Sequence, residues 1–175
     1  PNSPGVTAGT TKDTLVLQYN DVPGLEEAFA KHASRIAGVI FEPVVGNMGV
    51  VVPSAEFLSS LRTQTTQHGA LLICDEVMTG FRVALGGAQA RLKIQPDITT
   101  LGKALAGGAL PVSAIAGRKE IMKLYEDRKV VHGGTFHGYQ LGLAAVKATL
   151  EILAGEGGRA YDHMNRQMAR MNDIF

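Results

Sequence analysis

Short apolar runs alternate along the chain with longer segments of helical periodicity. Apolar and β-branched runs bounded by Gly, Pro, Asn or Asp predict strands, and apolar residues three and four positions apart predict amphipathic helices. The predicted strands are Thr14–Tyr19, Ile36–Phe41, Leu71–Cys74, Ile98–Leu101 and Val112–Ala116. The predicted helices are Val22–Ala33, residues 55–68 after a Ser54 cap, Arg118–Asp127, Tyr139–Leu153 and Ala160–Phe175. This alternation predicts an α/β fold, a three-layer α/β/α arrangement around a mostly parallel central sheet.

Two of the predicted helices have an apolar stripe that we expect to face the protein interior. In Tyr139–Leu153 the expected inner residues are Leu141, Ala144, Ala145, Ala148 and Ile152. The C-terminal helix carries Tyr161, Met164, Met168 and Met171 at helical spacing.

The run Leu71–Cys74 is apolar on both faces, which is typical of a central parallel strand covered by helices. Asp75 and Glu76 follow at its carboxyl end, where open α/β sheets bind their ligands. The segment Ile98–Leu101 leads into Gly102 and Lys103. If the two strands are neighbours, they bring an acid and a lysine to one edge of the sheet. That pair suggests a pyridoxal phosphate (PLP) enzyme, in which a lysine forms a Schiff base and an acid partners the pyridinium nitrogen. The alternative is a capping aspartate and a solvated lysine.

Composition and charge exclude several other classes. With 175 residues, 45% hydrophobic and 19% charged, the chain can bury one good core, and length alone predicts one domain. A net charge of +1 gives no reason to expect nucleic acid or an anionic membrane as a partner. There is no apolar run of transmembrane length and no signal peptide, so a cytoplasmic or organelle-interior location is expected. Cys74, the only cysteine, lies within an apolar run and is expected to be a core residue rather than a nucleophile.

Three motifs, in order and at consistent spacing, resemble those of one enzyme family. They are EPVVGNMGVVVP from Glu42, CDEVMTGFR from Cys74, and PDITTLGK ending at Lys103. The chain resembles the class III aminotransferases among the fold-type I PLP enzymes, nearly from end to end, and is most similar to the aminomutases of that family.

The resemblance also implies how the chain is organised, because family members are more than twice as long. Residues 1–13 are then a loop adjoining an active-site lid, 14–155 part of the PLP-binding large domain, and 156–175 a helix leading toward a small domain. The same resemblance implies that the protein is a homodimer.

The resemblance implies PLP as cofactor and a role for each matching residue. Lys103 is the catalytic residue: it binds PLP covalently and moves protons once substrate displaces it. Asp75 partners the ring nitrogen, and Val77, two residues on, packs against the ring. Thr135, next to Gly134, reaches the cofactor phosphate of the neighbouring subunit, so that a homodimer completes the site.

Three further residues are expected around the cofactor. Glu42 orients neighbouring groups, and Asn47 is a candidate hydrogen-bond partner of the ring substituents or the substrate. Met78 stands where many members of the family have a glutamine, which removes a hydrogen bond to the ring hydroxyl.

The expected substrate is a small amino acid or amino aldehyde. Movement of the amino group within one molecule is the first hypothesis. The alternative is transfer between an amino acid or amine and a keto acid, which the unusual segment from Phe136 to Gln140 favours. A non-catalytic regulator with a PLP fold is a further alternative. A nucleotide-binding domain has no support, because neither GxGxxG nor GxxxxGK[ST] follows a predicted strand.

Overall fold

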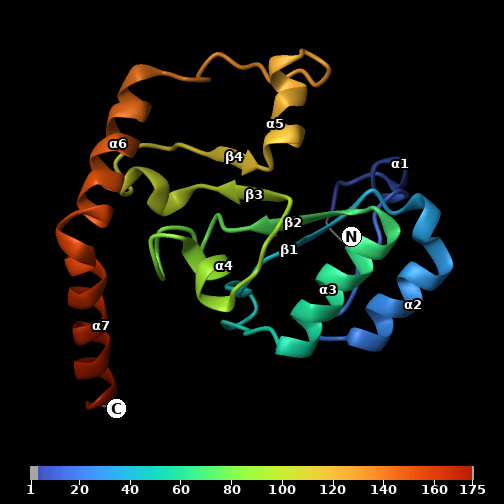
Figure 1. Ribbon diagram of the computed structural model, residues 1–175, viewed down its shortest axis with the longest axis horizontal. Coiled ribbons are helices and arrows are strands. Elements are labelled where there is room, and N and C mark those ends of the chain that lie inside the picture. The colour runs from blue at the N-terminus through green and yellow to red at the C-terminus, as the bar shows by residue number, and fades with distance from the viewer. Residues whose placement is uncertain (1–3, 175) are drawn as a thin grey trace.

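The computed structural model describes residues 4–174 and contains a four-stranded sheet in the order β1-β2-β3-β4. Strands β1 (Gly38–Phe41), β2 (Leu71–Asp75) and β3 (Ile98–Leu101) are parallel, and β4 (Ala114–Gly117) pairs antiparallel with β3 (Figure 1). The fold class is therefore as predicted: an α/β protein with a mostly parallel sheet.

Helices α2 (Val22–His32), α3 (Ala55–His68) and α4 (Gly87–Leu92) cover one face of the sheet. On the other face, α5 (Lys119–Glu126) packs at the β4 end, where the Met122 methyl lies 3.0 Å from the position that a Cβ on Gly117 would take. That second face is more open, because the Ile40 side chain is 63% exposed.

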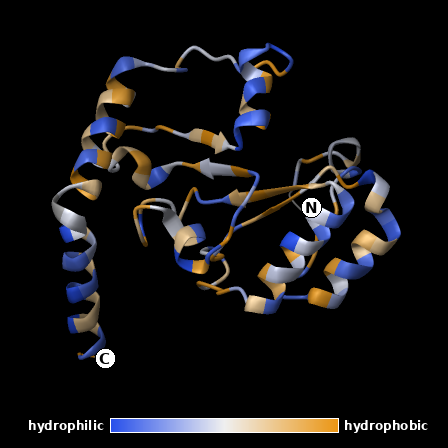
Figure 2. Ribbon diagram, in the orientation of Figure 1, coloured by the Kyte–Doolittle hydropathy of each residue, from blue (hydrophilic) through white to orange (hydrophobic). Residues whose placement is uncertain are grey.

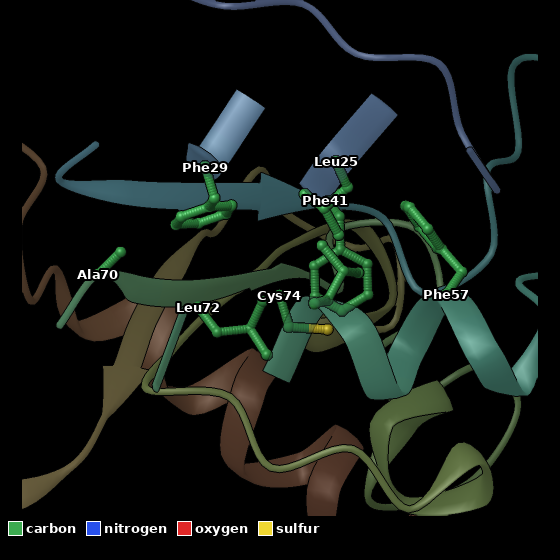
Figure 3. Close-up of a cluster of buried hydrophobic side chains, with 8 residues drawn as sticks. Leu25, Phe29, Phe41, Phe57, Ala70, Leu72 and Cys74 are labelled. Atoms are coloured by element: carbon green, nitrogen blue, oxygen red, sulfur yellow. The ribbon is translucent and has the colours of Figure 1, made fainter. Parts of the chain in front are cut away.

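The main core lies between α2, α3 and the first two strands (Figure 3). Alternating strand residues supply one side of it, and the apolar stripes of the two helices supply the other (Figure 2). Its buried members are Leu25, Phe29, Phe41, Phe57, Leu61, Ala70, Leu72 and Cys74. Burial of each large side chain contributes about 1.5–3 kcal/mol, so this cluster is the main source of stability for the sheet.

Capping residues explain where α2 and α3 begin and where α3 ends. Asp21 Oδ1 accepts a hydrogen bond from the Gly24 amide at 3.0 Å, and Ser54 Oγ accepts one from the Phe57 amide at 3.0 Å. Each bond satisfies an amide that has no partner within its helix. Gly69 ends α3 in the left-handed conformation, at φ 68°, and β2 starts two residues later.

A buried carboxylate fixes β3 beside β2. Asp97 Oδ2 accepts a hydrogen bond from the Leu72 amide at 2.8 Å and from Arg62 at 3.1 Å, and its Oδ1 accepts from Arg118 at 2.8 Å. The residue is 3% exposed, so its charge depends on these partners. One aspartate therefore links α3, β2, β3 and the start of α5.

Two long helices complete the described chain. Helix α6 (Gln140–Ala154) packs on the short 3₁₀ helix η2 (Lys103–Ala106), and α7 (Arg159–Asn172) follows another 3₁₀ turn, η3 (Glu156–Gly158). The Tyr161 hydroxyl at the start of α7 donates to the Phe81 carbonyl oxygen at 2.9 Å. Within residues 4–174, no helix is long and apolar enough to cross a membrane.

One predicted feature of the N-terminal segment is wrong. Thr14–Tyr19 is not a strand: it has no strand partner among the described residues, and the Val16 side chain is 71% exposed. Its alternating pattern does not lead to a strand because Tyr19 and Asn20 bond instead to a loop far along the sequence. The expected loop 1–13 contains one short helix, α1 (Ala8–Thr11), and residues 1–3 lie outside the described part.

The expected inner face of α6 is also mostly wrong. Leu141 and Ile152 are 73% and 71% exposed, and Ala144 and Ala148 are exposed as well. The helix turns a different face to η2, with Thr149 Oγ1 2.9 Å from the position that a Cβ on Gly107 would take. Periodicity identified the helix but not its contact face, because both faces carry small and apolar residues. The methionines of α7, at positions 164, 168 and 171, are exposed too.

Candidate functional site

The carboxyl end of β2 presents Asp75. It lies opposite Thr100 of β3 in the parallel register, and the Thr100 hydroxyl donates to Asp75 Oδ1 at 2.9 Å. The amide of Val77 donates to the same oxygen at 3.0 Å. Among the described residues, both donors to this carboxylate bond to Oδ1, so Oδ2 is available to a ligand.

Lys103 lies at the end of the neighbouring strand. It follows Gly102 directly after β3, begins η2, and is exposed. The Val77 side chain packs 3.4 Å from the position that a Cβ on Gly102 would take, so the two strand ends are in contact. The prediction that neighbouring strands bring an acid and a lysine to one sheet edge is confirmed.

Lys103 has a positive φ of 45°, an uncommon conformation for a residue with a side chain. Such strain costs on the order of 1–2 kcal/mol and occurs frequently at functional sites. Here it accompanies the change of direction from β3 into η2.

A loop over residues 43–52 lies beside Asp75. Glu42 precedes it, and Glu42 Oε2 accepts a hydrogen bond from the Gly46 amide at 3.3 Å. Met78 packs directly on Gly46, whose Cβ position is 2.1 Å from the Met78 sulfur, so a larger residue there would require the Met78 side chain to move. Asn47 is exposed in the turn that follows. The structure thus brings Glu42, Met78 and this loop together at the same edge as Asp75.

Gly134 and Thr135 lie elsewhere. The connection between α5 and α6 that carries them is well separated from the carboxyl end of β2 (Figure 1), and both residues are exposed. His137 in the same connection stacks on His132 at a ring distance of 4.2 Å. Within one chain, Thr135 is therefore not part of the Asp75 and Lys103 site.

Glu76 has a role that its position next to Asp75 did not reveal. Its side chain is fully buried and accepts hydrogen bonds from the Thr79 hydroxyl and from the amides of Ala88 and Gln89, the latter two at 3.0 and 2.6 Å. It therefore anchors the loop that follows Asp75 to the first turn of α4. Strand alternation, which places Glu76 on the opposite face from Asp75, is the signal that could have revealed this role.

Thr100 is the second residue that sequence reasoning missed. Nothing in its local sequence distinguishes it from Thr99, and only the register of β3 against β2 places it opposite Asp75.

Cys74 is a core residue, as expected. It is fully buried, and burial, followed by the nearby carboxylates of Glu76 and Asp75, raises the pKa of its thiol well above the ordinary value. A thiol that keeps its proton is a poor nucleophile.

Arg82 and His68 have structural positions. Arg82 is exposed, and its Nε donates to the Met78 carbonyl oxygen at 2.8 Å. The His68 ring, in the last turn of α3, stacks on Phe29 at 5.3 Å.

An α/β sheet that presents a carboxylate and a lysine at the ends of adjacent parallel strands agrees with the comparisons to known proteins. The class-III aminotransferase family matches residues 1–173, and the chain belongs to this family.

The chain is 52% identical over 174 residues to a glutamate-1-semialdehyde 2,1-aminomutase of Rhodopirellula baltica, an alignment that covers 99% of this chain and 39% of that protein. It is 57% identical over 158 residues to the protein of the same name in Thermomicrobium roseum, covering 90% of this chain and 36% of that protein. The chain therefore spans about two fifths of the length of these relatives.

Solved structures share the fold. An omega-transaminase from Sphaerobacter thermophilus matches with a TM-score of 0.82 and 31% identity, over 88% of this chain and 36% of that one. A structure described as a transaminase with PLP bound matches with a TM-score of 0.81 and 32% identity, over 87% of this chain and 37% of that one.

Proposed function

We propose that the full-length protein is a PLP-dependent enzyme that converts glutamate-1-semialdehyde to 5-aminolevulinate. The observation that carries the proposal is the placement of Asp75 and Lys103 at the ends of adjacent parallel strands. The relatives named as aminomutases, which share 52% and 57% sequence identity with this chain, support the choice of reaction.

The residues at this edge fit PLP. Asp75 has one carboxylate oxygen fixed by Val77 and Thr100 and the other available to a protonated ring nitrogen. Lys103 offers a primary amine from an exposed position, and the Val77 side chain beside Gly102 supplies an apolar surface for a flat ring. When bound, PLP withdraws electrons from the substrate carbon that carries the amino group.

Each residue then has a defined task. Asp75 Oδ2 holds the proton on the ring nitrogen, because a carboxylate favours the positively charged form of its partner. Lys103 Nζ carries the cofactor before substrate arrives and afterwards accepts and returns the substrate proton. Glu42 fixes the Gly46 amide and thereby the loop that carries Asn47, the proposed hydrogen-bond partner of cofactor or substrate.

The attachment residue can be identified directly. Borohydride reduction of the full-length protein with PLP should place the pyridoxyl label on the peptide that contains Lys103. Lys12, Lys31 and Lys119 serve as internal controls, and a label on any of them instead would refute the assignment.

A second candidate reaction is transfer of an amino group between an amino acid or amine and a keto acid. The omega-transaminase similarity and the segment from Phe136 to Gln140 favour it. Substrate and product of the aminomutase are isomers, so that reaction needs no second substrate. Formation of 5-aminolevulinate from glutamate-1-semialdehyde without an added keto acid supports the aminomutase, whereas turnover that requires both a donor and a keto acid supports the transaminase.

We also propose that the protein is a homodimer in which Thr135 serves the partner's site. The supporting observations are that Thr135 is exposed and that the α5–α6 connection, which carries it, is separated from the carboxyl end of β2 in its own chain (Figure 1). The test mixes Lys103→Ala and Thr135→Val subunits. A shared site predicts that the mixed dimer regains one intact site and binds PLP, although neither variant alone does so normally. No recovery in a confirmed mixed dimer contradicts the proposal.

A further inference from the structure

The 43–52 loop contacts the segment that follows Asp75, through Gly46 and Met78. It is closed by a two-way backbone bridge between Val45 and Val51, with both N···O distances at 3.0 Å. Its turn is exposed, with Met48 and Val50 61% and 67% exposed, and Gly46 rests on Met78. The bridge gives the loop a fixed internal shape, so its position at the sheet edge depends on how its two ends are held.

Tyr19 holds the first end. Its hydroxyl donates to the Glu42 carbonyl oxygen at 2.8 Å, and its ring packs on Phe57 of α3 at 5.0 Å. Burial, the largest cause, together with the nearby Cys74 and Glu42 side chains, raises the pKa of Tyr19 to about 12. The hydroxyl therefore remains a donor throughout the range in which enzymes are assayed.

Asn20 holds the second end. Its Nδ2 donates to the Val52 carbonyl oxygen at 3.0 Å, and its Oδ1 accepts from the Ser54 amide at 2.9 Å. The residue has a φ of 65°, which asparagine tolerates better than most residues. Two adjacent residues thus bond both ends of a loop that lies more than twenty positions away in the sequence.

We propose that Tyr19 and Asn20 are positioning residues that set the place of the 43–52 loop relative to Asp75 and Lys103 and thereby determine how tightly the substrate is held. The inference rests on the proposed function, because it treats the loop as a wall of the PLP site. The two side chains act through the loop backbone. Their loss shifts the loop tip without touching the strand ends that bind the cofactor.

The variants Asn20→Gly and Tyr19→Phe in the full-length holoenzyme test the proposal. Glycine keeps the positive φ and removes only the amide bonds, and phenylalanine keeps the ring packing and removes only the hydroxyl bond. We expect KM for glutamate-1-semialdehyde to rise about tenfold in Asn20→Gly and less in Tyr19→Phe, because two and one hydrogen bonds are lost. Values of kcat and the extent of borohydride labelling at Lys103 should stay within about twofold of wild type.

Tyr161→Phe is the matched control, since it removes the same kind of bond, from a tyrosine hydroxyl to a carbonyl oxygen, and that oxygen belongs to Phe81 rather than to the loop. Its KM should be unchanged. Equal increases in KM for the control and the Tyr19 variant would show a general loss of stability and overturn the proposal.

Amide hydrogen exchange provides a readout that does not depend on activity. The Val45 and Val51 amides should exchange faster in Asn20→Gly. The exchange rate of the Leu72 amide, which lies in β2 and bonds to the Asp97 carboxylate, should not change. Unchanged exchange at the loop, or an unchanged KM in an active enzyme, overturns the inference. If wild type carries no label at Lys103, the proposed function fails instead, and the exchange result alone decides whether Tyr19 and Asn20 position the loop.

Discussion

At the scale of single residues, the two oxygens of Asp75 have different partners. Oδ1 is held by the Val77 amide and the Thr100 hydroxyl, and Oδ2 is left for a ligand. Asparagine has nearly the same shape as aspartate and retains one acceptor oxygen. The substitution Asp75→Asn therefore removes the negative charge while keeping the side chain in place.

Asp75→Asn should keep the cofactor bound and lower kcat by about 100-fold or more, because the ring nitrogen loses the negative charge that keeps it protonated. The measurement combines borohydride labelling at Lys103 with steady-state kinetics. Thr100→Val, which removes one hydrogen bond and no charge, should lower kcat much less. Turnover near that of wild type in Asp75→Asn would refute the assigned role.

Cys74 should resist thiol reagents in the native protein. Its pKa is raised by burial, so the reactive thiolate is scarcer in the folded state than in the unfolded state at every pH below the raised value. Labelling with a chromogenic disulfide at pH 8 should be slow in buffer and fast in denaturant. Rapid labelling under native conditions would show that the strand opens readily.

At the scale of elements, the loop after Asp75 depends on close packing between Glu76 and the start of α4. A Cβ on Gly87 would lie 2.5 Å from Glu76 Oε1, and Gly87 has a φ of 69°. A larger residue there would displace the buried Glu76 carboxylate and break its hydrogen bonds with the Ala88 and Gln89 amides.

Gly87→Ala should lower the free energy of unfolding by about 2–4 kcal/mol, from strain at positive φ and from the clash with Glu76. Gly69→Ala is the matched control, because Gly69 has a φ of 68° and open space around its Cβ position. It should cost only about 1 kcal/mol. Denaturant unfolding of the full-length variants measures both, and equal losses would show that the clash is relieved without cost.

The elements also show what sequence could and could not predict. Patterns within one segment were reliable: the strand that ends at Asp75, the strand before Lys103, and the Ser54 cap all follow from adjacent residues. Features that depend on distant partners were missed. Thr14–Tyr19 alternates like a strand but has no strand to pair with, and Thr100 becomes important only through its register against Asp75.

At the scale of the whole molecule, the proposed function needs residues from more than one part of the protein. Under that proposal Asp75 and Lys103 serve the ring nitrogen and the aldehyde carbon of PLP, and the α5–α6 connection that carries Thr135 lies apart from both (Figure 1). The exposed apolar side chains of Ile40, Leu141 and Ile152 mark surfaces that are available to further protein.

The isolated segment should therefore bind PLP weakly or not at all, while the full-length protein binds it tightly. Equilibrium dialysis of both against PLP makes the comparison, with full-length Lys103→Ala as the control for loss of the covalent link. Tight binding by the segment would show that the phosphate is held by residues within it.

The eight buried residues of the main core all lie between Leu25 and Cys74, on consecutive elements of the chain. A ribosome makes this stretch before it makes Lys103, and the contacts within it are short in sequence. The main core, which orients β2, can thus pack during synthesis, before β3 and Lys103 have been made. When β3 then pairs with the edge of β2, Thr100 comes to lie opposite Asp75. Asp75 and Lys103 are therefore brought together late, after β2 has already packed against the core.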